Sequence, residues 1–448
     1  MGKILISALP AKGHLNPLVA IGLALVEQGH EVMFATDERY RAQLQRVGLP
    51  LEALPYPDGA VDTTIKMFEK PAHWMAQLRR KPPESYFFDH LDLLTKGLID
   101  TIRRYQPDAL LTDLNFYAGS VAAEACNLPY ATYCAIVAAL NTPDAPPYGL
   151  GLDWVPSGHW QRWLWPILNL PVRWILWRHD RLLNPVRRQF GLEPVRGGLL
   201  DHSPYLSLVP TTETYEYPRR DLPRQIMYVG PVTSSQRGEV HDDFPWKWFD
   251  HDMRPTVYVS MGTIVGGQQV FQEVIEAARG AAWKAVLAVG MGTDVSQFVN
   301  VPDNVLIRNF VPQLEVLKRV DAVVSHGGNN TVTETLMHGL PLVVIPFSAD
   351  QPESAGRIKA AGVGIRMRPG LAQRVRLRRA IEAVLTDPHY QEAAQRVQQS
   401  YARCNGTQTA AALVGRLAVT GQPIMRPDGM RPTLVGIAEL LEKQATGQ

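Results

Sequence analysis

Two residues in the N-terminal part of the chain, His14 and Asp113, have side chains suited to proton transfer. His14 lies in the segment GHLNP after a first apolar run, and Asp113 directly follows another run at 109–112. An imidazole with a pKa of about 6.5 can take a proton from a hydroxyl at neutral pH, and a carboxylate on its other nitrogen fixes its tautomer. A lone histidine is more often structural, so the pair predicts a general base only where the fold brings the two together.

A second polar segment follows an apolar run in the C-terminal half and reads Ser325-His326-Gly327-Gly328-Asn329-Asn330-Thr331. Two glycines allow a ligand to approach the backbone, and the first N–H groups of the helix expected next attract an anion. His326, Asn330 and Thr331 add polar groups. The segment therefore predicts a diphosphate site, against the alternative of a plain glycine turn with a helix cap.

Three more polar residues lie just beyond that segment. Glu334 falls one turn into the same expected helix, well placed to accept hydrogen bonds from ribose hydroxyls. Asp350 and Gln351 follow the next expected strand, 342–346. Open α/β sheets bind ligands at the carboxyl ends of their strands, so these side chains are expected at the same site.

Two sheets are needed to position these groups. Strand-like apolar runs fall at 3–9, 30–36, 109–112, 130–134, 256–260, 285–289, 305–308, 322–325 and 342–346. Helical patterns lie between them, at 16–28, about 86–105, 118–126, 271–280, 313–320, 331–338, 351–361 and 376–385. Alternating strands and helices predict parallel sheets with helices on both faces. The expected fold class is α/β, with two doubly wound Rossmann-like domains facing a cleft and His14 on a strand-to-helix loop.

The domain boundaries follow from changes in composition. We assign 1–220 to an N-terminal domain, 221–254 to a polar, proline-rich linker, 255–425 to a C-terminal domain, and 426–448 to a terminal helix. Between about 143 and 221 many Pro, Trp and Arg residues weaken the periodicity, which indicates inserted helices and loops.

The segment HGGNNTVTETLMHGLPLVVIPFSADQ (326–351) resembles the nucleotide-sugar signature of family 1 glycosyltransferases. The matching positions are His326, Gly327, Gly328, Asn330, Thr331, Glu334, Gly339, Pro341, Pro346, Asp350 and Gln351. Upstream, YVSMGT resembles the family's first phosphate loop, with Gly262 and Thr263 in place. NFVPQ resembles the base-holding segment, with Phe310 and Gln313. GHLNP and LLTDLNFY resemble the segments that supply the family's catalytic His and Asp. The resemblance covers nearly the whole chain and is weakest from about 143 to 217.

The resemblance implies a UDP-glycosyltransferase-like enzyme of GT-B fold that inverts the anomeric carbon in one in-line displacement. His14 would deprotonate the acceptor hydroxyl while Asp113 orients the ring. His326, the loop N–H groups and Thr263 would hold the leaving diphosphate, and no metal or cofactor would be needed. Asp350 and Gln351 would hold the sugar hydroxyls, and the terminal helix would pack back on the N-terminal, acceptor-binding domain.

Two departures from the plant members bear on the sugar. Phe310 and Asn329 stand where those members carry Trp, which is more in keeping with bacterial and animal relatives and weakens the inference of glucose. We expect a bacterial natural-product enzyme, of macrolide or carotenoid type, that moves a hexose, with glucose and UDP expected, to a small lipophilic alcohol. Polyphenols, macrolides, terpenoids and carotenoids are the acceptor classes considered.

Three alternatives are weighed. A non-catalytic GT-B helper that binds a partner enzyme would have no need for His14, Asp113, His326 and Gln351 together. An epimerase or cell-wall transferase of the same architecture is disfavoured by GHLNP and the terminal Asp-Gln. A nicotinamide enzyme is disfavoured because ALPAKG, not Gly-x-Gly-x-x-Gly, follows the first strand.

Composition excludes several other classes. The 448 residues include 45 Lys and Arg against 43 Asp and Glu, and a net charge of +2 predicts no nucleic-acid binding. Three cysteines give neither a disulfide framework nor a zinc site, and Asp250-His251-Asp252 is interpreted as polar linker. No uninterrupted apolar run reaches the roughly 20 residues of a membrane span. We expect a soluble cytoplasmic protein; its oligomeric state is not predicted.

The tryptophans are clustered. Six of the ten fall at Trp154, Trp160, Trp163, Trp165, Trp174 and Trp177. Such clusters usually pack in a core, but this one lies on the expected acceptor side. We therefore expect Trp163 and Trp174, with Tyr117, to wall an apolar acceptor pocket, and the segment to be able to touch a membrane surface.

Overall fold

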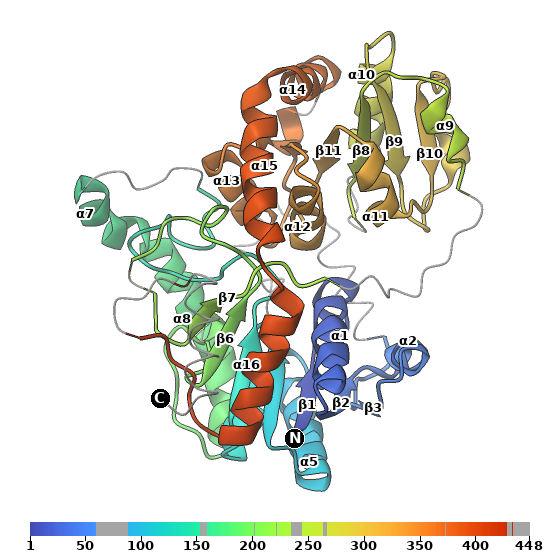
Figure 1. Ribbon diagram of the computed structural model, residues 1–448. Helices are drawn as coiled ribbons and strands as arrows, with labels where there is room; N and C mark the ends of the chain where they lie inside the picture. Colours follow the sequence, from blue (N-terminus) through green and yellow to red (C-terminus); the bar gives the residue numbers. More distant parts are fainter. Residues whose placement is uncertain are drawn as a thin grey trace.

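One parallel sheet, buried on both faces, forms the centre of the N-terminal lobe in the computed structural model (Figure 1). The model describes residues 1–59, 88–152, 159–200, 202–220, 222–233, 244–262, 267–371, 373–427 and 432. The strands are β1 (Lys3–Ser7), β2 (Glu31–Thr36), β3 (Leu51–Ala53), β4 (Ala109–Asp113), β5 (Tyr130–Tyr133), β6 (Leu206–Val209) and β7 (Ile226–Tyr228). Their order is β3-β2-β1-β4-β5-β6-β7, with every pair parallel.

A second parallel sheet forms the C-terminal lobe. It contains β8 (Thr256–Ser260), β9 (Lys284–Ala288), β10 (Val305–Arg308), β11 (Ala322–Ser325), β12 (Leu342–Val344) and β13 (Gly364–Arg366), in the order β10-β9-β8-β11-β12-β13. In each sheet the chain first adds strands toward one edge and then returns to the centre and adds strands toward the other edge. This change occurs between β1 and β4 in the first sheet and between β8 and β11 in the second. Such switch points are where doubly wound sheets bind ligands.

Helices cover both sheets. The N-terminal lobe contains α1 (Lys12–Glu27), α2 (Arg41–Arg46), α5 (Leu91–Tyr105), α6 (Tyr117–Ala125), α7 (His159–Leu168) and α8 (Leu170–Gln189). The C-terminal half contributes α9 (Lys247–Asp250), α10 (Gly267–Ala278), α11 (Gln313–Val316), α12 (Asn329–Met337), α13 (Gln351–Ala360), α14 (Arg374–Thr386), α15 (Pro388–Ala402) and α16 (Gly406–Thr420). The predicted α/β class with two doubly wound domains is confirmed.

Helix α16 crosses from the C-terminal lobe to the N-terminal lobe, where it lies beside α1 (Figure 1). Its apolar residues Leu413, Val414 and Leu417 are fully buried in the core of the N-terminal lobe. The crossing helix is therefore α16, which lies within the range assigned to the C-terminal domain. Of the expected terminal helix 426–448, only 426, 427 and 432 are described.

Strand β7 differs from the sequence-based expectation, because it lies in the range assigned to the linker. It completes the first sheet by pairing with β6. Arg426 binds it there, since its guanidinium donates from Nε to the Ile226 carbonyl at 2.9 Å and from Nη2 to the Leu222 carbonyl at 3.1 Å. A three-residue strand held by its neighbours gives little periodic signal.

The start of α1 also differs, and it moves His14 from the expected loop into the first turn of the helix. Pro17 lies inside α1 and has no N–H to donate to the carbonyl of Gly13 four residues earlier. That carbonyl instead accepts a hydrogen bond from Asn330 Nδ2 of the other lobe at 3.2 Å. Because Pro17 leaves it free, the Gly13 carbonyl thus provides an acceptor across the boundary of the lobes.

Candidate active site

His14 and Asp113 are brought together by neighbouring strands of the first sheet. Asp113 is the last residue of β4, which pairs with β1, and His14 lies in the helix that follows β1. The Nδ1–H of His14 donates to Asp113 Oδ2 at 2.5 Å. Asp113 is fully buried, and its Oδ1 accepts from the backbone N–H of Asn115 at 3.0 Å. In the neutral ring this pairing leaves Nε2 unprotonated and able to accept a proton.

The surroundings make His14 a stronger base than an exposed histidine. Burial lowers its pKa, but the charge and hydrogen bond of Asp113 and the charge of Asp350 outweigh burial, so the pKa is raised above 6.5. The electrostatic interaction between His14 and Asp350 couples the two lobes, because Asp350 belongs to the C-terminal half. Burial raises the pKa of Asp350 to about 6, against the opposing effect of His14.

The ring of His326 lies between two glycines. A Cβ added at Gly328 would lie 2.6 Å from His326 Nε2, and one added at Gly262 would lie 2.8 Å from Cε1. Burial, opposed by a hydrogen bond with the Ser260 backbone, lowers the pKa of His326 to about 4. The ring is therefore neutral at pH 7, and its Nδ1 has no hydrogen-bond partner among the described residues. A neutral buried ring with an unused nitrogen can form a hydrogen bond with an uncharged or anionic ligand.

The N-terminus of α12 faces the other lobe. Asn330 donates from Nδ2 to the Gly13 carbonyl, and Asn329 donates from Nδ2 to the Ala135 carbonyl, each at 3.2 Å. Thr331 lies in the first turn of the same helix. Backbone N–H groups without intrahelical partners are thus presented beside His14, as an anion site requires.

The residues expected to hold the base and ribose bind each other. Gln313 donates from Nε2 to Glu334 Oε2 at 2.7 Å, and its Oε1 accepts from the Tyr258 hydroxyl at 3.0 Å. Glu334 is only 2% exposed. Phe310 lies half-buried just after β10. These contacts fix Gln313 and Glu334 at the edge of the second sheet, next to the start of α12.

Gln351 shapes the turn that presents Asp350. Its Oε1 accepts from the backbone N–H groups of Phe347 and Ser348, at 2.8 and 3.2 Å. Ala349 has a φ of 54°, a left-handed conformation that costs energy for a residue with a side chain. The turn places Asp350 at the N-cap of α13, close enough to His14 to affect its pKa.

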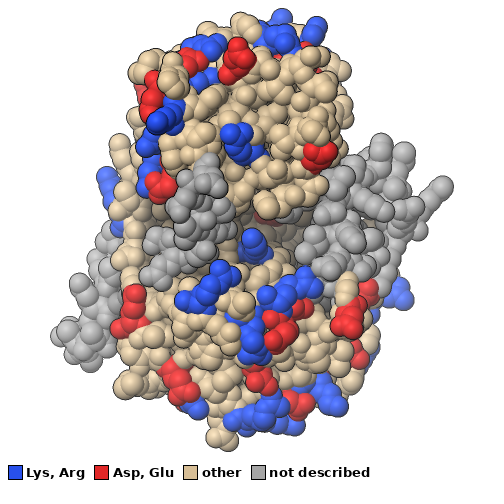
Figure 2. Space-filling view, turned by 90° about the vertical axis from the view of Figure 1, so that its right-hand side faces the viewer, with Lys and Arg blue, Asp and Glu red and all other residues tan. Residues whose placement is uncertain are grey.

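Helices α1 and α12 border a hollow between the lobes. Its lining comes from both halves: Asn16, Pro17, Tyr133, Pro210, Val232, Thr233, Asn329, Asn330, Thr333 and Glu334. Figure 2 shows the surface hollowed between the two lobes, with acidic and basic side chains interspersed on this face. The site is therefore built at the boundary of the lobes.

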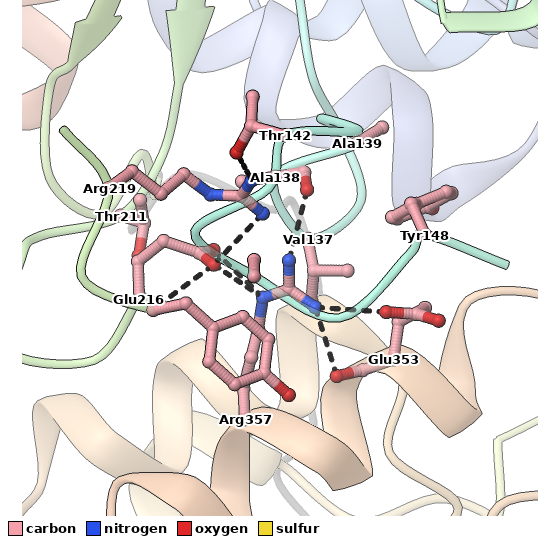
Figure 3. A network of polar contacts seen from close by, with 12 residues as sticks. Val137, Ala138, Ala139, Thr142, Tyr148, Thr211, Glu216, Arg219, Glu353 and Arg357 are labelled. Atoms are coloured by element: carbon pink, nitrogen blue, oxygen red, sulfur yellow. Dashed lines mark hydrogen bonds and ion pairs between the residues drawn. The ribbon is translucent and has the colours of Figure 1, made fainter. Parts of the chain in front are cut away.

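A buried ionic network, which the sequence did not reveal, ties α13 to the N-terminal lobe (Figure 3). Arg357 donates from Nε to Glu216 Oε2 at 2.8 Å, from Nη2 to the Ala138 carbonyl at 3.0 Å and from Nη1 to the Glu353 carbonyl at 3.1 Å. Glu353 Oε1 in turn accepts from the backbone N–H groups of Gly149 and Gly151, at 3.0 and 2.7 Å. The only local signal was the Glu353–Arg357 spacing, since Glu216 and Ala138 are distant in sequence.

The remaining predicted site residues are scattered. Tyr117 is buried at the start of α6, where its ring stacks on Phe88 with centroids 5.0 Å apart. Trp163 and Trp174 lie on the surface, 83% and 46% exposed. The structure thus does not place these three side chains around one cavity. Thr263 lies outside the described residues.

Two features are absent from the described part of the chain. No helix there combines the length and apolar character needed to cross a membrane. No group of three or more His, Cys, Asp and Glu side chains there is arranged to hold a metal ion.

Two family models match the two lobes separately. Residues 4–133 match the glycosyltransferase family 28 N-terminal domain. Residues 283–414 match the C-terminal domain of erythromycin biosynthesis protein CIII-like proteins. The first match contains His14 and Asp113, and the second contains the segment from Phe310 to Gln351.

Curated relatives align along nearly their whole length. The chain is 28% identical over 418 residues to 4'-demethylrebeccamycin synthase of Lentzea aerocolonigenes, covering 89% of this chain and 96% of that protein. It is 27% identical over 405 residues to NDP-glycosyltransferase YjiC of Bacillus subtilis, covering 90% and 94%. Demethyllactenocin mycarosyltransferase of Streptomyces fradiae is 27% identical over 429 residues, covering 92% and 86%.

Solved structures share the fold at lower identity. The glycotransferase of kitacinnamycin superimposes with a TM-score of 0.72 at 23% identity, covering 93% of this chain and 98% of that one. The calicheamicin glycosyltransferase CalG4 gives 0.71 at 19% identity, covering 93% and 99%.

Proposed function

The chain belongs to the family 1 glycosyltransferases of GT-B fold and bacterial natural-product type, and we propose that it transfers a hexose from a nucleoside diphosphate sugar to a hydroxyl of a small lipophilic acceptor. The observation that carries the proposal is the position of His14 at the boundary of the lobes. There it pairs with Asp113 and lies near Asp350 and the N-terminus of α12. A base, a carboxylate and an anion site are the groups this transfer needs.

In the proposed reaction, His14 Nε2 takes the proton of the acceptor hydroxyl as its oxygen attacks the anomeric carbon. The bond from that carbon to the diphosphate oxygen breaks in the same step, on the opposite face, so the configuration inverts. The buried carboxylate of Asp113 stabilises the imidazolium that forms. Asp350 and Gln351 are proposed to hold the sugar hydroxyls.

The departing diphosphate gains negative charge as the bond breaks. Backbone N–H groups at the start of α12 and the neutral ring of His326 are proposed to stabilise that charge. Gly262 and Gly328 support this role because they leave room for the ring. The proposal assigns no metal, so transfer should persist in excess chelator, and its loss there with recovery on adding a divalent cation would contradict this part.

Glucose and UDP are the proposed sugar and nucleotide, and the comparisons leave this choice open to test. One structural relative, VinC, was solved in complex with DTDP, and the spinosyn rhamnosyltransferase SpnG with thymidine diphosphate. Both uridine and thymidine donors therefore belong in the assay. The proposed acceptors are polyphenols, macrolides, terpenoids and carotenoid alcohols.

The direct test is an acceptor-by-donor screen with detection by mass. Several nucleotide sugars are each offered with several lipophilic alcohols, and one pairing is expected to yield an acceptor heavier by one hexose residue. Binding of a nucleoside diphosphate without transfer to any acceptor would contradict the enzymatic role. Stable capture of another transferase by the same chain would then favour a helper protein.

A further inference from the structure

Helices α7 and α8 present apolar side chains to solvent along one face. Trp163, Ile167, Leu170, Trp174 and Trp177 follow one another at alternating spacings of four and three residues. Their exposed fractions are 83%, 63%, 55%, 46% and 52%. Within each of the two helices, such spacing places the side chains on one side, where most globular proteins would bury them. We call these five residues the tryptophan stripe.

The opposite side of α8 is the one that packs on the protein. Val172, His179, Leu183 and Arg187 are buried, and Arg187 donates from Nη2 to Glu124 Oε2 at 2.7 Å. The helix is therefore fixed by a second set of contacts, and the tryptophan stripe faces away from them. The stripe is not needed to hold α8 in place.

The charge around the stripe is mostly positive. Residues 159–189 contain six arginines and a single acidic residue, Asp180, although the whole chain has a net charge of only +2. Arg162 and Arg187 pair with Asp144 and Glu124, so the excess of positive charge comes from Arg173, Arg178, Arg181 and Arg188. Asp180 is buried and accepts from the backbone N–H groups of Gly197 and Gly198, at 2.7 and 2.9 Å. Its charge is thus directed into the protein, and the exposed face of α8 is basic.

Two of the arginines are held against tryptophans of the stripe. The guanidinium of Arg178 lies 4.9 Å from the ring centre of Trp174, and that of Arg181 lies 5.0 Å from the ring centre of Trp177. Arg173 is also exposed on the same helix. Indole rings flanked by cations are suited to the boundary between acyl chains and anionic headgroups, where Trp and Arg are favoured.

We propose that the tryptophan stripe is a docking surface for a membrane rich in anionic lipid, with α7 and α8 lying along its interface. The occupant follows from charge complementarity: an anionic surface is attracted by the exposed arginines, whereas a second copy would bring the same basic face and be repelled. No described helix can span a bilayer, so the contact is peripheral. The proposal does not depend on the enzymatic function.

The experiment uses the full-length protein and lipid vesicles. Wild type is sedimented with vesicles of phosphatidylcholine alone and of phosphatidylcholine with 30% phosphatidylglycerol, at low and high salt. We expect binding to the anionic vesicles that weakens with salt. Trp174→Ala with Trp177→Ala should lower the partition coefficient at least about tenfold, because two large apolar side chains no longer enter the interface.

The matched control lies on α14, another helix with exposed arginine and apolar residues. Val375 is 53% exposed there, and Arg376 is exposed beside it. Val375→Ala with Arg376→Ala should leave vesicle binding unchanged. Equal loss in both double variants would show that binding does not depend on the tryptophan stripe and would overturn the proposal.

Two other measurements keep the proposal falsifiable where a variant folds poorly. Brominated acyl chains should quench the tryptophan fluorescence of the wild type in anionic vesicles, and absence of quenching would overturn insertion of the stripe. Sedimentation velocity without lipid should show no association through this face. If the wild type forms a dimer that the tryptophan double variant does not form, the stripe would be an interface between protein chains instead. The same would follow if the wild type binds an acidic protein but not the vesicles.

Discussion

The imidazole of His14 combines a hydrogen-bonded orientation with a position at the boundary of the lobes. Its Nδ1 is occupied by Asp113 at 2.5 Å, so the proton-accepting atom is Nε2. Asp113 has no solvent exposure, and a second hydrogen bond from the Asn115 backbone holds it. The pair is therefore set before any ligand arrives, as a general base requires.

Asp113→Asn tests this orientation. The amide cannot hold His14 in the same tautomer or stabilise its charged form, so kcat should fall about 10²–10⁴-fold. Binding of the nucleoside diphosphate, measured by calorimetry, should change little because Asp113 lies in the other lobe. A variant with wild-type kcat would contradict the pairing as a catalytic device.

The pH dependence of kcat/KM follows from two raised pKa values. His14 must be neutral to act, and its pKa is raised above 6.5 by Asp113 and Asp350, so activity should fall as pH drops through that higher value. Protonation of Asp350, with a pKa of about 6, should steepen the loss below pH 6. In Asp113→Asn the residual activity should fall at a lower pH, because a negative charge that favoured the charged imidazole is gone. An unshifted acid limb would contradict the assignment.

Gly328→Ala tests the space around His326. The new Cβ would lie 2.6 Å from Nε2, and Gly328 has a φ of −61°, so alanine brings no backbone strain. The ring must move, and the dissociation constant of the nucleoside diphosphate should rise about tenfold or more, as for one lost hydrogen bond to a charged group. Gly292→Ala is the control, because nothing lies within 4 Å of the Cβ that would be added there. Equal affinities of the two variants for the nucleoside diphosphate would contradict a role for His326 in binding it.

At the level of secondary-structure elements, α13 links donor-side residues to the N-terminal lobe. Asp350 and Gln351 stand at its start, and Arg357 near its end binds Glu216 and the Ala138 carbonyl. The segment after β5 is held by Glu353 of the same helix. The network therefore fixes the distance between Asp350 and the N-terminal lobe.

Arg357→Met tests how much this network contributes to the free energy of unfolding. The change leaves Glu353 buried without its cation and Glu216 with only Arg219, 3.7 Å away, which should destabilise the protein by about 3–5 kcal/mol in urea unfolding. Lys318→Met is the control, since its pair with Glu315 is more than half exposed and is worth about 0–1 kcal/mol. Adding Glu216→Gln to Arg357→Met should restore part of the loss, and similar stabilities for Arg357→Met and Lys318→Met would show that the network holds nothing together.

Elements with strong local patterns could be predicted from the sequence, and those fixed by distant contacts could not. Strands β8, β10 and β11 match the expected ranges because each is a buried β-favouring run. Strands β3, β6 and β13 and helices α15 and α16 were missed, and β7 was taken for linker. His14 was expected on a loop because the helix was predicted to begin at residue 16, whereas α1 begins at Lys12 and Asn330 of the other lobe satisfies the Gly13 carbonyl that Pro17 leaves free.

The candidate site divides in the same way. The motif spacing predicted His14, Asp113, His326 and Asp350 as site residues, because each lies at the end of a strand of a parallel sheet or follows one. Glu216, Glu353 and Arg357 form their network only after both lobes have folded and met, and nothing local marks Glu216. The exposure of Trp163 and Trp174 likewise depends on which face of α7 and α8 the protein covers.

In the whole molecule, the switch points of the two sheets face each other across the boundary of the lobes. Helix α16 then returns the chain to the N-terminal lobe and packs in its core. The near-neutral total charge conceals a basic helix, because acidic residues elsewhere balance the arginines of α8. The molecule thus combines a mixed-charge face over the hollow (Figure 2) with a basic, tryptophan-bearing helix elsewhere.

We propose that this fold brings a histidine base to a nucleotide-sugar site. The most direct measurement compares sugar transfer by wild type and His14→Ala, with the affinity of each for the nucleoside diphosphate. We expect kcat to fall at least about 10²-fold while the dissociation constant is unchanged. Transfer by His14→Ala at the wild-type rate would contradict it.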